Sequence, residues 1–174
     1  MSRTLLIAPH ADDETLFASY LAQRHAAVVA VIYDEGRSDE LGMATAWLGC
    51  DYVQLAARKG MGEEETETYV NGLRDPSGQD DWERVIAPAE EAAGHEEHNI
   101  VARVAGEVFS DVPIIRYTTY APRGQRTKGR EEIEPTWAQI RRKLAALSCY
   151  ATQIEDTATR PWFFDLLDMR EWVA

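Results

Sequence analysis

An apolar run near the start of the chain ends abruptly in a cluster of polar side chains. Residues 4–8 (TLLIA) form the run, and residues 9–14 (PHADDE) follow it directly, before a helical pattern. Such a run is typical of a buried strand. One imidazole and three carboxylates are therefore expected where a strand ends and a helix begins. Because ligands bind at the carboxyl ends of strands in open α/β sheets, the cluster indicates a functional site.

Strand and helix patterns alternate along most of the chain. Residues 27–33 form a continuous Val/Ile-rich run, which is typical of a strand buried on both faces of a parallel sheet. Repeated strand–helix units favour right-handed crossovers and a doubly wound sheet. We therefore predict an α/β, Rossmann-like three-layer fold with a mainly parallel sheet, in one domain spanning residues 1–174. The predicted strands are 4–8, 27–33, 51–55, 83–87 and 113–117, and the predicted helices are 13–24, 38–48, 98–109 and 135–153.

Three details of this prediction can be compared with the structure. Ser38 is expected to cap its helix, and residues 59–81 read as a long loop with at most one short helix. The last long helix is expected to bury one apolar stripe, which consists of Trp137, Ile140, Leu144 and Leu147. The aromatic tail, residues 161–173, is expected to pack back on the body, and its aromatic residues leave a homo-oligomer open.

The charge balance narrows the classes of partner. The 174 residues carry a formal net charge of −12, which disfavours general nucleic-acid binding and anionic membrane surfaces, because both reward a basic face. The first apolar run stops at Pro9, and no later stretch approaches the length of a membrane-spanning helix. A cytoplasmic protein without membrane insertion is the expectation.

The histidines fall mainly in two clusters at strand-to-helix passages. His10, Asp13 and one of His95 or His98 would give two imidazoles and one carboxylate, with an open position for water, as in hydrolytic zinc sites. Asp12 would be left free to handle a proton. The alternatives are that Asp12 or Asp13 only caps the following helix, and that the second histidine pair is solvent-exposed polarity.

These segments resemble a known family. Residues 9–16 (PHADDETL) are similar to the amino-terminal signature of the LmbE-like, or PIG-L-like, zinc-dependent N-deacetylases, and residues 94–98 (GHEEH) are similar to their second His-containing motif. Residues 37–41 (RSDEL) with 48–49 (LG) are similar to the family's Arg-x-x-Glu-Leu helix. A fourth similarity, to the carboxyl-terminal helix, rests on Lys143, Leu144, Tyr150 and Gln153.

The resemblance implies a role for each matching residue. It makes His10, Asp13 and His98 the ligands of one Zn²⁺ per chain, with Fe²⁺ as the alternative metal. It makes Asp12 the general base toward the water that zinc activates, and His95 a stabiliser of the oxyanion.

The resemblance also implies substrate contacts. Arg37 and Asp75 match positions that bind a sugar-like substrate, although a surface salt bridge of Arg37 with Asp39 or Glu40 is the alternative. The chain departs from the family at Glu96-Glu97, where the family usually has Pro-Asp, so Glu97 would have to supply the support that an Asp gives the metal ligands. The connection between Asp75 and the second motif is also short for the family.

The sequence therefore predicts a metal-dependent N-deacetylase. Its small-molecule substrate would be an N-acetylated amino sugar such as N-acetylglucosamine, or a conjugate of one. A magnesium-dependent phosphohydrolase using Asp12 or Asp13 and a non-catalytic metal-binding protein of the same fold stay open as alternatives. A dinucleotide-binding module is disfavoured, because no Gly-x-Gly-x-x-Gly follows the first strand. The basic stretch 120–130 is either a lid that recruits an anionic group or a solvated loop.

Overall fold

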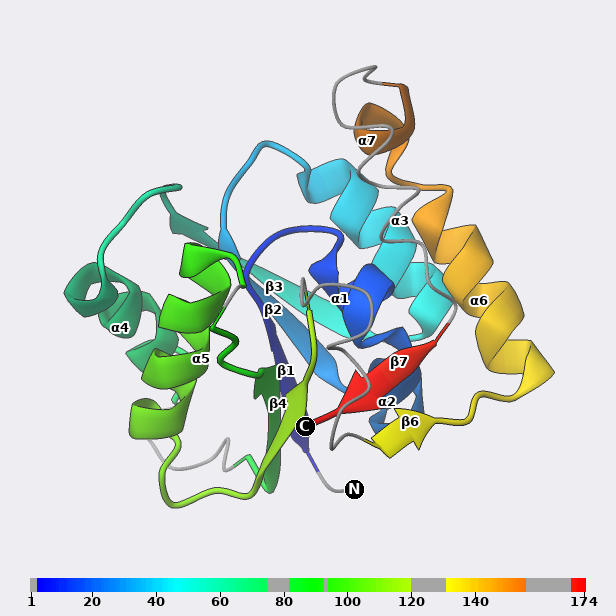
Figure 1. The fold of residues 1–174 in the computed structure, drawn as a ribbon. Coiled ribbons are helices and arrows are strands. Elements are labelled where there is room, and N and C mark those ends of the chain that lie inside the picture. Colours follow the sequence, from blue (N-terminus) through cyan, green and yellow to red (C-terminus); the bar gives the residue numbers. More distant parts are fainter. Residues whose placement is uncertain (1–2, 75–81, 93, 120–130, 156–169) are drawn as a thin grey trace.

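A seven-stranded sheet forms the middle layer of the fold, and helices cover both of its faces (Figure 1). The structure is a computed structural model that describes residues 3–74, 82–92, 94–119, 131–155 and 170–174. The strands are β1 Thr4–Ala8, β2 Val28–Tyr33, β3 Asp51–Ala57, β4 Arg84–Pro88, β5 Ile114–Tyr117, β6 Glu131–Ile133 and β7 Glu171–Val173. The helices are α1 Asp13–Phe17, α2 Ser19–His25, α3 Ser38–Leu48, α4 Glu63–Asn71, α5 Glu96–Val108, α6 Trp137–Leu147 and α7 Ala151–Glu155.

The strand order is β3-β2-β1-β4-β5-β7-β6. The strands β1 to β5 pair in parallel, whereas β7 runs antiparallel to both β5 and β6. The chain moves outward from β1 through β2 to β3 and then returns to place β4 on the other side of β1. The order therefore reverses between β1 and β4, where α/β folds of this type bind their ligands. The predicted Rossmann-like fold with a mainly parallel sheet is confirmed.

The central strand β1 is buried on both faces. Leu5 and Ile7 pack into the cluster that contains residues of α5, such as Val104, while Leu6 and Ala8 pack into the cluster formed with α1, α2, α3 and α6. Successive side chains of a strand point to opposite faces, so an unbroken apolar run suits a strand between two helical layers. Figure 1 shows α4 and α5 on one side of the sheet and α3 and α6 on the other.

The predicted helix 13–24 is divided in two. Ala18, with φ −135° and ψ 14°, separates α1 from α2. At the start of α2, the Ser19 hydroxyl donates to Oε1 of Glu171 at 2.5 Å, and the Tyr20 backbone N–H donates to Oε2 of the same carboxylate at 2.9 Å. A carboxylate from β7 thus binds donors at a helix start, where N–H groups lack intrahelical partners. This contact is non-local, so helical periodicity could not reveal the break.

The inward face of α6 was predicted only in part, because Leu147 is buried and Ile140 packs against the core, whereas Trp137 and Leu144 face outward. Trp137 is 80% exposed and Leu144 is 48% exposed. Lys143 takes the inward position, where its ammonium donates to the Leu16 carbonyl at 2.9 Å and to Oε1 of Glu171 at 2.8 Å. Because the Lys143 charge is partnered on the inner side, the apolar stripe of the helix is rotated away from Leu144. The predicted helix 135–153 also ends at Leu147 and resumes as α7.

The one short helix that was allowed within residues 59–81 is present, and other local predictions differ from the structure in smaller ways. The region 59–81 contains the helix α4, whose first turn carries the acidic run at 63–65, where negative charge is favourable. Ser38 is the first helical residue of α3, and Arg37 occupies the N-cap without a side-chain cap. The short strands β6 and β7 were not predicted. Asp75, the stretch 120–130 and the tail up to residue 169 lie outside the described residues.

None of the helices in the described residues is both long and apolar enough to cross a membrane.

The buried pair of Lys143 and Glu171 predicts a large stability effect. Both side chains are almost fully buried, at 1% and 0% exposure. Replacing Lys143 by Met should lower the free energy of unfolding in urea by about 3–5 kcal/mol, because it leaves the Glu171 carboxylate buried without its counter-charge. Arg103→Met, which removes exposed ion pairs with Glu63 and Glu90, is the control and should cost far less. Equal losses in the two variants would contradict this reading.

Candidate metal and catalytic site

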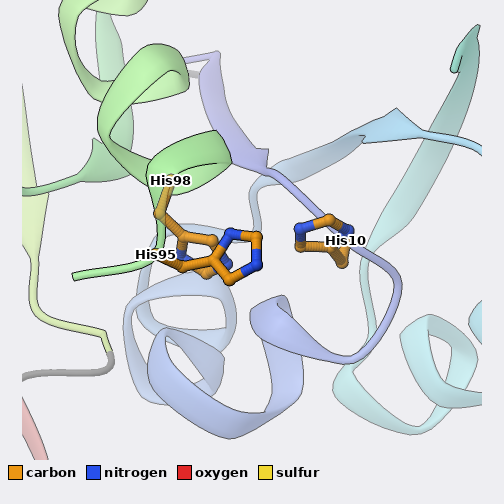
Figure 2. A group of neighbouring side chains, drawn as sticks. All are labelled: His10, His95 and His98. Atoms are coloured by element: carbon orange, nitrogen blue, oxygen red, sulfur yellow. The ribbon is translucent and has the colours of Figure 1, made fainter. Parts of the chain in front are cut away.

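Three imidazoles meet at the carboxyl ends of the neighbouring strands β1 and β4. His10 follows β1, His95 is the N-cap residue of α5, and His98 lies in the first turn of that helix. Each ring offers a nitrogen that lies within 4.8 Å of those of the other two. Figure 2 shows His10 facing the two histidines of α5. The parallel pairing of β1 with β4 therefore brings together the two histidine motifs predicted from the sequence.

Asp13 lies beside this group and contacts two of the three histidine residues. Its Oδ2 lies 3.1 Å from Nε2 of His98 and accepts the backbone N–H of His10 at 2.9 Å. Burial alone would raise the pKa of Asp13, but the charge and hydrogen bond of His98, together with His10, lower it. The predicted ligands were His10, Asp13 and His98. The three histidines offer ring nitrogens within 4.8 Å of one another, and Asp13 contacts His98, so these four side chains lie together.

The donor set fits a metal ion. Nδ1 of His10 and Oδ1 of Asp13 are buried and have no hydrogen-bond partner among the described residues. Buried polar atoms are normally satisfied, and orphaned ones call for an explanation such as an ion. Imidazole nitrogens with a carboxylate oxygen are ligands that zinc prefers, and imidazole also suits iron. The residues present can therefore hold such a metal.

Asp12 has an unusual backbone and a perturbed carboxyl group. Its φ of 120° lies in a region that L residues rarely adopt, at a cost of about 1–3 kcal/mol, and such strain clusters at functional sites. Burial raises the pKa of Asp12 from its ordinary 3.8 to about 7; the Arg37 guanidinium opposes this rise, and the charges of Asp13 and Glu14 add to it. Asp12 makes no side-chain cap on α1, so helix capping does not account for its carboxylate.

Arg37 lies against the site and not on the outer surface. Its Nη1 donates to Oδ2 of Asp12 at 2.7 Å, and its Nη2 donates to Oε2 of Glu35. The alternative partners, Asp39 and Glu40, are therefore not the ones that the structure pairs with it. Lys59, 62% exposed at its side chain, donates to Oε1 of Glu35 at 3.1 Å. Arg37 thus links Asp12 to Glu35, and Glu35 in turn contacts Lys59.

Glu97 connects the imidazoles to the loop before α4. Its Oε1 accepts the Gly60 backbone N–H at 2.7 Å, while its Oε2 lies 3.2 Å from Nε2 of His10 and 3.7 Å from Nδ1 of His95. Hydrogen bonding to His10 lowers the pKa of Glu97 to about 2, against the effect of its burial. In the sequence, Glu97 was recognised as a departure from the family motif. Nothing local indicated its contact with Gly60.

His95 is the most open of the three histidines, with its side chain 42% exposed. Burial, followed by the neighbouring charges of His98 and His10, lowers the pKa of His95. A neutral imidazole is therefore favoured, and a neutral imidazole can still donate one N–H.

Two carboxylates of the site were missed at the sequence level. Glu35 stands in the turn after β2, at a third carboxyl end of the parallel sheet, and this position is the signal that could have found it. Glu14 belongs to the first motif, but the sequence could not show that its carboxyl group accepts a hydrogen bond from the distant Tyr150.

Comparisons with known proteins support the fold. Neither a family model nor a curated protein sequence matches the chain. Among solved structures, a deacetylase triple mutant (Orf2*T) involved in the teicoplanin biosynthetic pathway aligns with a TM-score of 0.74 at 15% identity, over 95% of this chain and 89% of that one. GalB, the 4-carboxy-2-hydroxymuconate hydratase of Pseudomonas putida KT2440, aligns with a TM-score of 0.71 at 14% identity, over 95% and 84%.

A third solved structure is the N,N'-diacetylchitobiose deacetylase from Pyrococcus horikoshii. It aligns with a TM-score of 0.64 at 15% identity, over 93% of this chain and 75% of that one. At such identities the likeness concerns the fold. This chain shares the α/β fold of these solved deacetylases, in agreement with the LmbE-like resemblance of its motifs.

Proposed function

We propose that this protein is a metal-dependent amide hydrolase, and specifically an N-deacetylase that acts on an N-acetylated amino sugar or its conjugate. The observation that carries the proposal is the meeting of three imidazoles at the ends of β1 and β4, next to the segment that holds the buried carboxylates Asp12 and Asp13. Two of the fold neighbours are deacetylases, one of them named for a diacetylated sugar. The hydratase neighbour has the same fold, so the reaction type is argued from the site.

The metal is proposed to be held by His10, Asp13 and His98, with His95 beside it. When bound, zinc or iron there would supply a Lewis acid that polarises the amide carbonyl and lowers the pKa of water. Glu97, which lies within 3.7 Å of ring nitrogens of His10 and His95, would hold these two rings in orientation.

Asp12 is proposed as the general base. Its carboxyl has a pKa of about 7, so it can accept the proton of the attacking water at neutral pH and return it to the departing amine. The neutral, partly exposed His95 would donate its N–H to the oxygen that gains negative charge when water adds to the carbonyl. Arg37 would hold the Asp12 carboxylate in place and contact hydroxyls of a sugar-like substrate. Asp75 stays a second predicted substrate contact.

Amine release should be measured over a panel of N-acetylated sugars, sugar nucleotides and glycoconjugates. We expect release of acetate and free amine in equal amounts, loss of this activity with a chelator, and its return with Zn²⁺ or Fe²⁺. Addition of water to an unsaturated acid without amine release would favour a hydratase, and phosphate release that requires magnesium would favour a phosphohydrolase.

Asp12→Asn should keep the metal and lower kcat by about a hundredfold or more, because the amide fills the same space but accepts no proton. Turnover and metal content are measured on the same sample. Asp34→Asn is a matched control. Oδ1 of Asp34 accepts the Gly36 backbone N–H and the Gln54 side-chain amide in an exposed position, so this variant should leave kcat unchanged. An Asp12→Asn enzyme with more than a few per cent of wild-type turnover would overturn the assignment of Asp12.

His98→Ala should lower the metal content of protein purified without added metal, from about one ion per chain to well below one. His25→Ala, at a histidine that contacts Arg84 and lies outside the cluster, should leave it unchanged. Full metal content in His98→Ala would show that the ion is held elsewhere.

Arg37→Ala should raise KM for a sugar-like substrate and also lower kcat, with metal content unchanged, because Arg37 contacts the proposed base as well as the proposed substrate region. Arg103→Ala, which removes a surface guanidinium, serves as the charge control. If KM and kcat both match those of the control, Arg37 has no part in the reaction.

A further inference from the structure

Three hydrogen-bond donors meet at the buried carboxylate of Glu14. Its Oε2 accepts the backbone N–H of Asp12 at 3.0 Å. Its Oε1 accepts the hydroxyls of Thr15 and Tyr150, each at 2.5 Å. Glu14 and Tyr150 are both 0% exposed, so neither group meets solvent. The proposed catalytic steps do not use the side chains of Glu14, Thr15 and Tyr150.

The bonds around Asp12 fix an otherwise unfavourable conformation. Its carbonyl accepts the backbone N–H groups of Thr15 and Leu16 at 3.0 and 2.8 Å, while its own N–H is bound by Glu14. Hydrogen bonds therefore hold the peptide groups on both sides of Asp12, the residue whose φ is 120°. A strained residue persists only where its surroundings determine it in this way. Of these contacts, the one with Glu14 is made by a side chain and can be changed by mutation.

Tyr150 links this arrangement to a distant part of the chain. It lies between α6 and α7, and its ring packs in the same apolar cluster as Leu16 and Phe17 of α1. A carboxylate removed from water needs donors from the protein, and its direction follows where they stand. Tyr150, together with Thr15, therefore fixes the direction of the Glu14 carboxylate, and Glu14 holds the N–H side of the Asp12 backbone.

We propose that Glu14 and Tyr150 are positioning residues that hold Asp12 in the backbone conformation required for proton transfer. This inference rests on the proposed function, in which Asp12 is the base. Neither residue touches the substrate. Their effect on turnover would pass through the placement of the Asp12 carboxylate, since a displacement of about 1 Å can cost on the order of a hundredfold in rate.

The first test is Tyr150→Phe, which removes one hydroxyl and keeps the ring. We expect kcat to fall at least about tenfold, with KM and metal content unchanged. The exchange rate of the Asp12 amide proton, followed by NMR with ¹⁵N-labelled aspartate, should rise about fivefold or more as its acceptor loosens. The second measurement needs no substrate.

Tyr117→Phe is the matched control. Tyr117 is also 0% exposed, and its hydroxyl donates to the Ile7 carbonyl at 3.0 Å, without contact to Glu14. It should destabilise the fold about as much as Tyr150→Phe, while leaving kcat and the Asp12 amide exchange near the wild-type values. A role of Tyr150 in stability alone predicts that the two variants behave alike in all measurements.

Glu14→Gln tests whether geometry is what matters. Its amide oxygen can accept from Asp12, and its NH₂ can donate to the Thr15 and Tyr150 hydroxyls, so we expect most of kcat and of the amide protection to remain. Glu14→Ala should lose both. Should Glu14→Ala fail to fold, the comparison of Tyr150→Phe with Tyr117→Phe still decides.

The outcomes separate the two proposals. If wild-type protein releases no amine from any substrate, the proposed function fails, while the Asp12 amide exchange still reports whether Glu14 and Tyr150 hold that backbone. If Tyr150→Phe leaves both kcat and exchange at the levels of Tyr117→Phe, the positioning role is overturned whatever the substrate.

Discussion

The parallel pairing of β1 with β4 is the constraint on which the site depends. Strand order reverses between these two strands, so the segments that follow them leave the sheet at the same edge. His10 comes from one segment, and His95 and His98 come from the other. Neither segment holds three imidazoles alone. The fold therefore creates the cluster, because the pairing of β1 with β4 brings together imidazoles that come from separate segments of the chain.

Buried ionisable side chains determine how the helices around the site pack together. The carboxylate of Glu171 binds the start of α2 and the ammonium of Lys143, while Glu14 binds the backbone before α1 and the hydroxyl of Tyr150. Each would be costly to bury without partners. Because the partners come from distant elements, α1, α2, α6 and β7 have to fit together in one arrangement. This requirement gives the short helix α1 a defined position next to the histidines.

Much of the fold could be predicted from the sequence, because its signals are local. Unbroken apolar runs marked β1 and β2, the alternation of strand and helix patterns marked the other three parallel strands, and the polar residues after β1 and β4 marked the candidate site. What was missed depends on long-range contacts. Lys143 faces inward toward Glu171 and the Leu16 carbonyl. Arg37 pairs with Asp12 and Glu35, and not with Asp39 or Glu40. Strands as short as β6 and β7 carry too few residues for a periodic pattern. The roles of Asp75 and of the stretch 120–130 stay predictions.

The antiparallel edge of the sheet also sets an order of assembly. In the described part of the chain, β6 pairs only with β7, and β7 brings Glu171 to Lys143 and to the junction of α1 with α2. During synthesis, the five parallel strands emerge first and can pair while the ribosome is still adding residues. The carboxylate that supports the α1–α2 junction arrives only with residue 171. The packing of α1, α2 and α6 therefore requires β7 as well as the parallel strands, since without Glu171 the Lys143 ammonium lacks its buried anion.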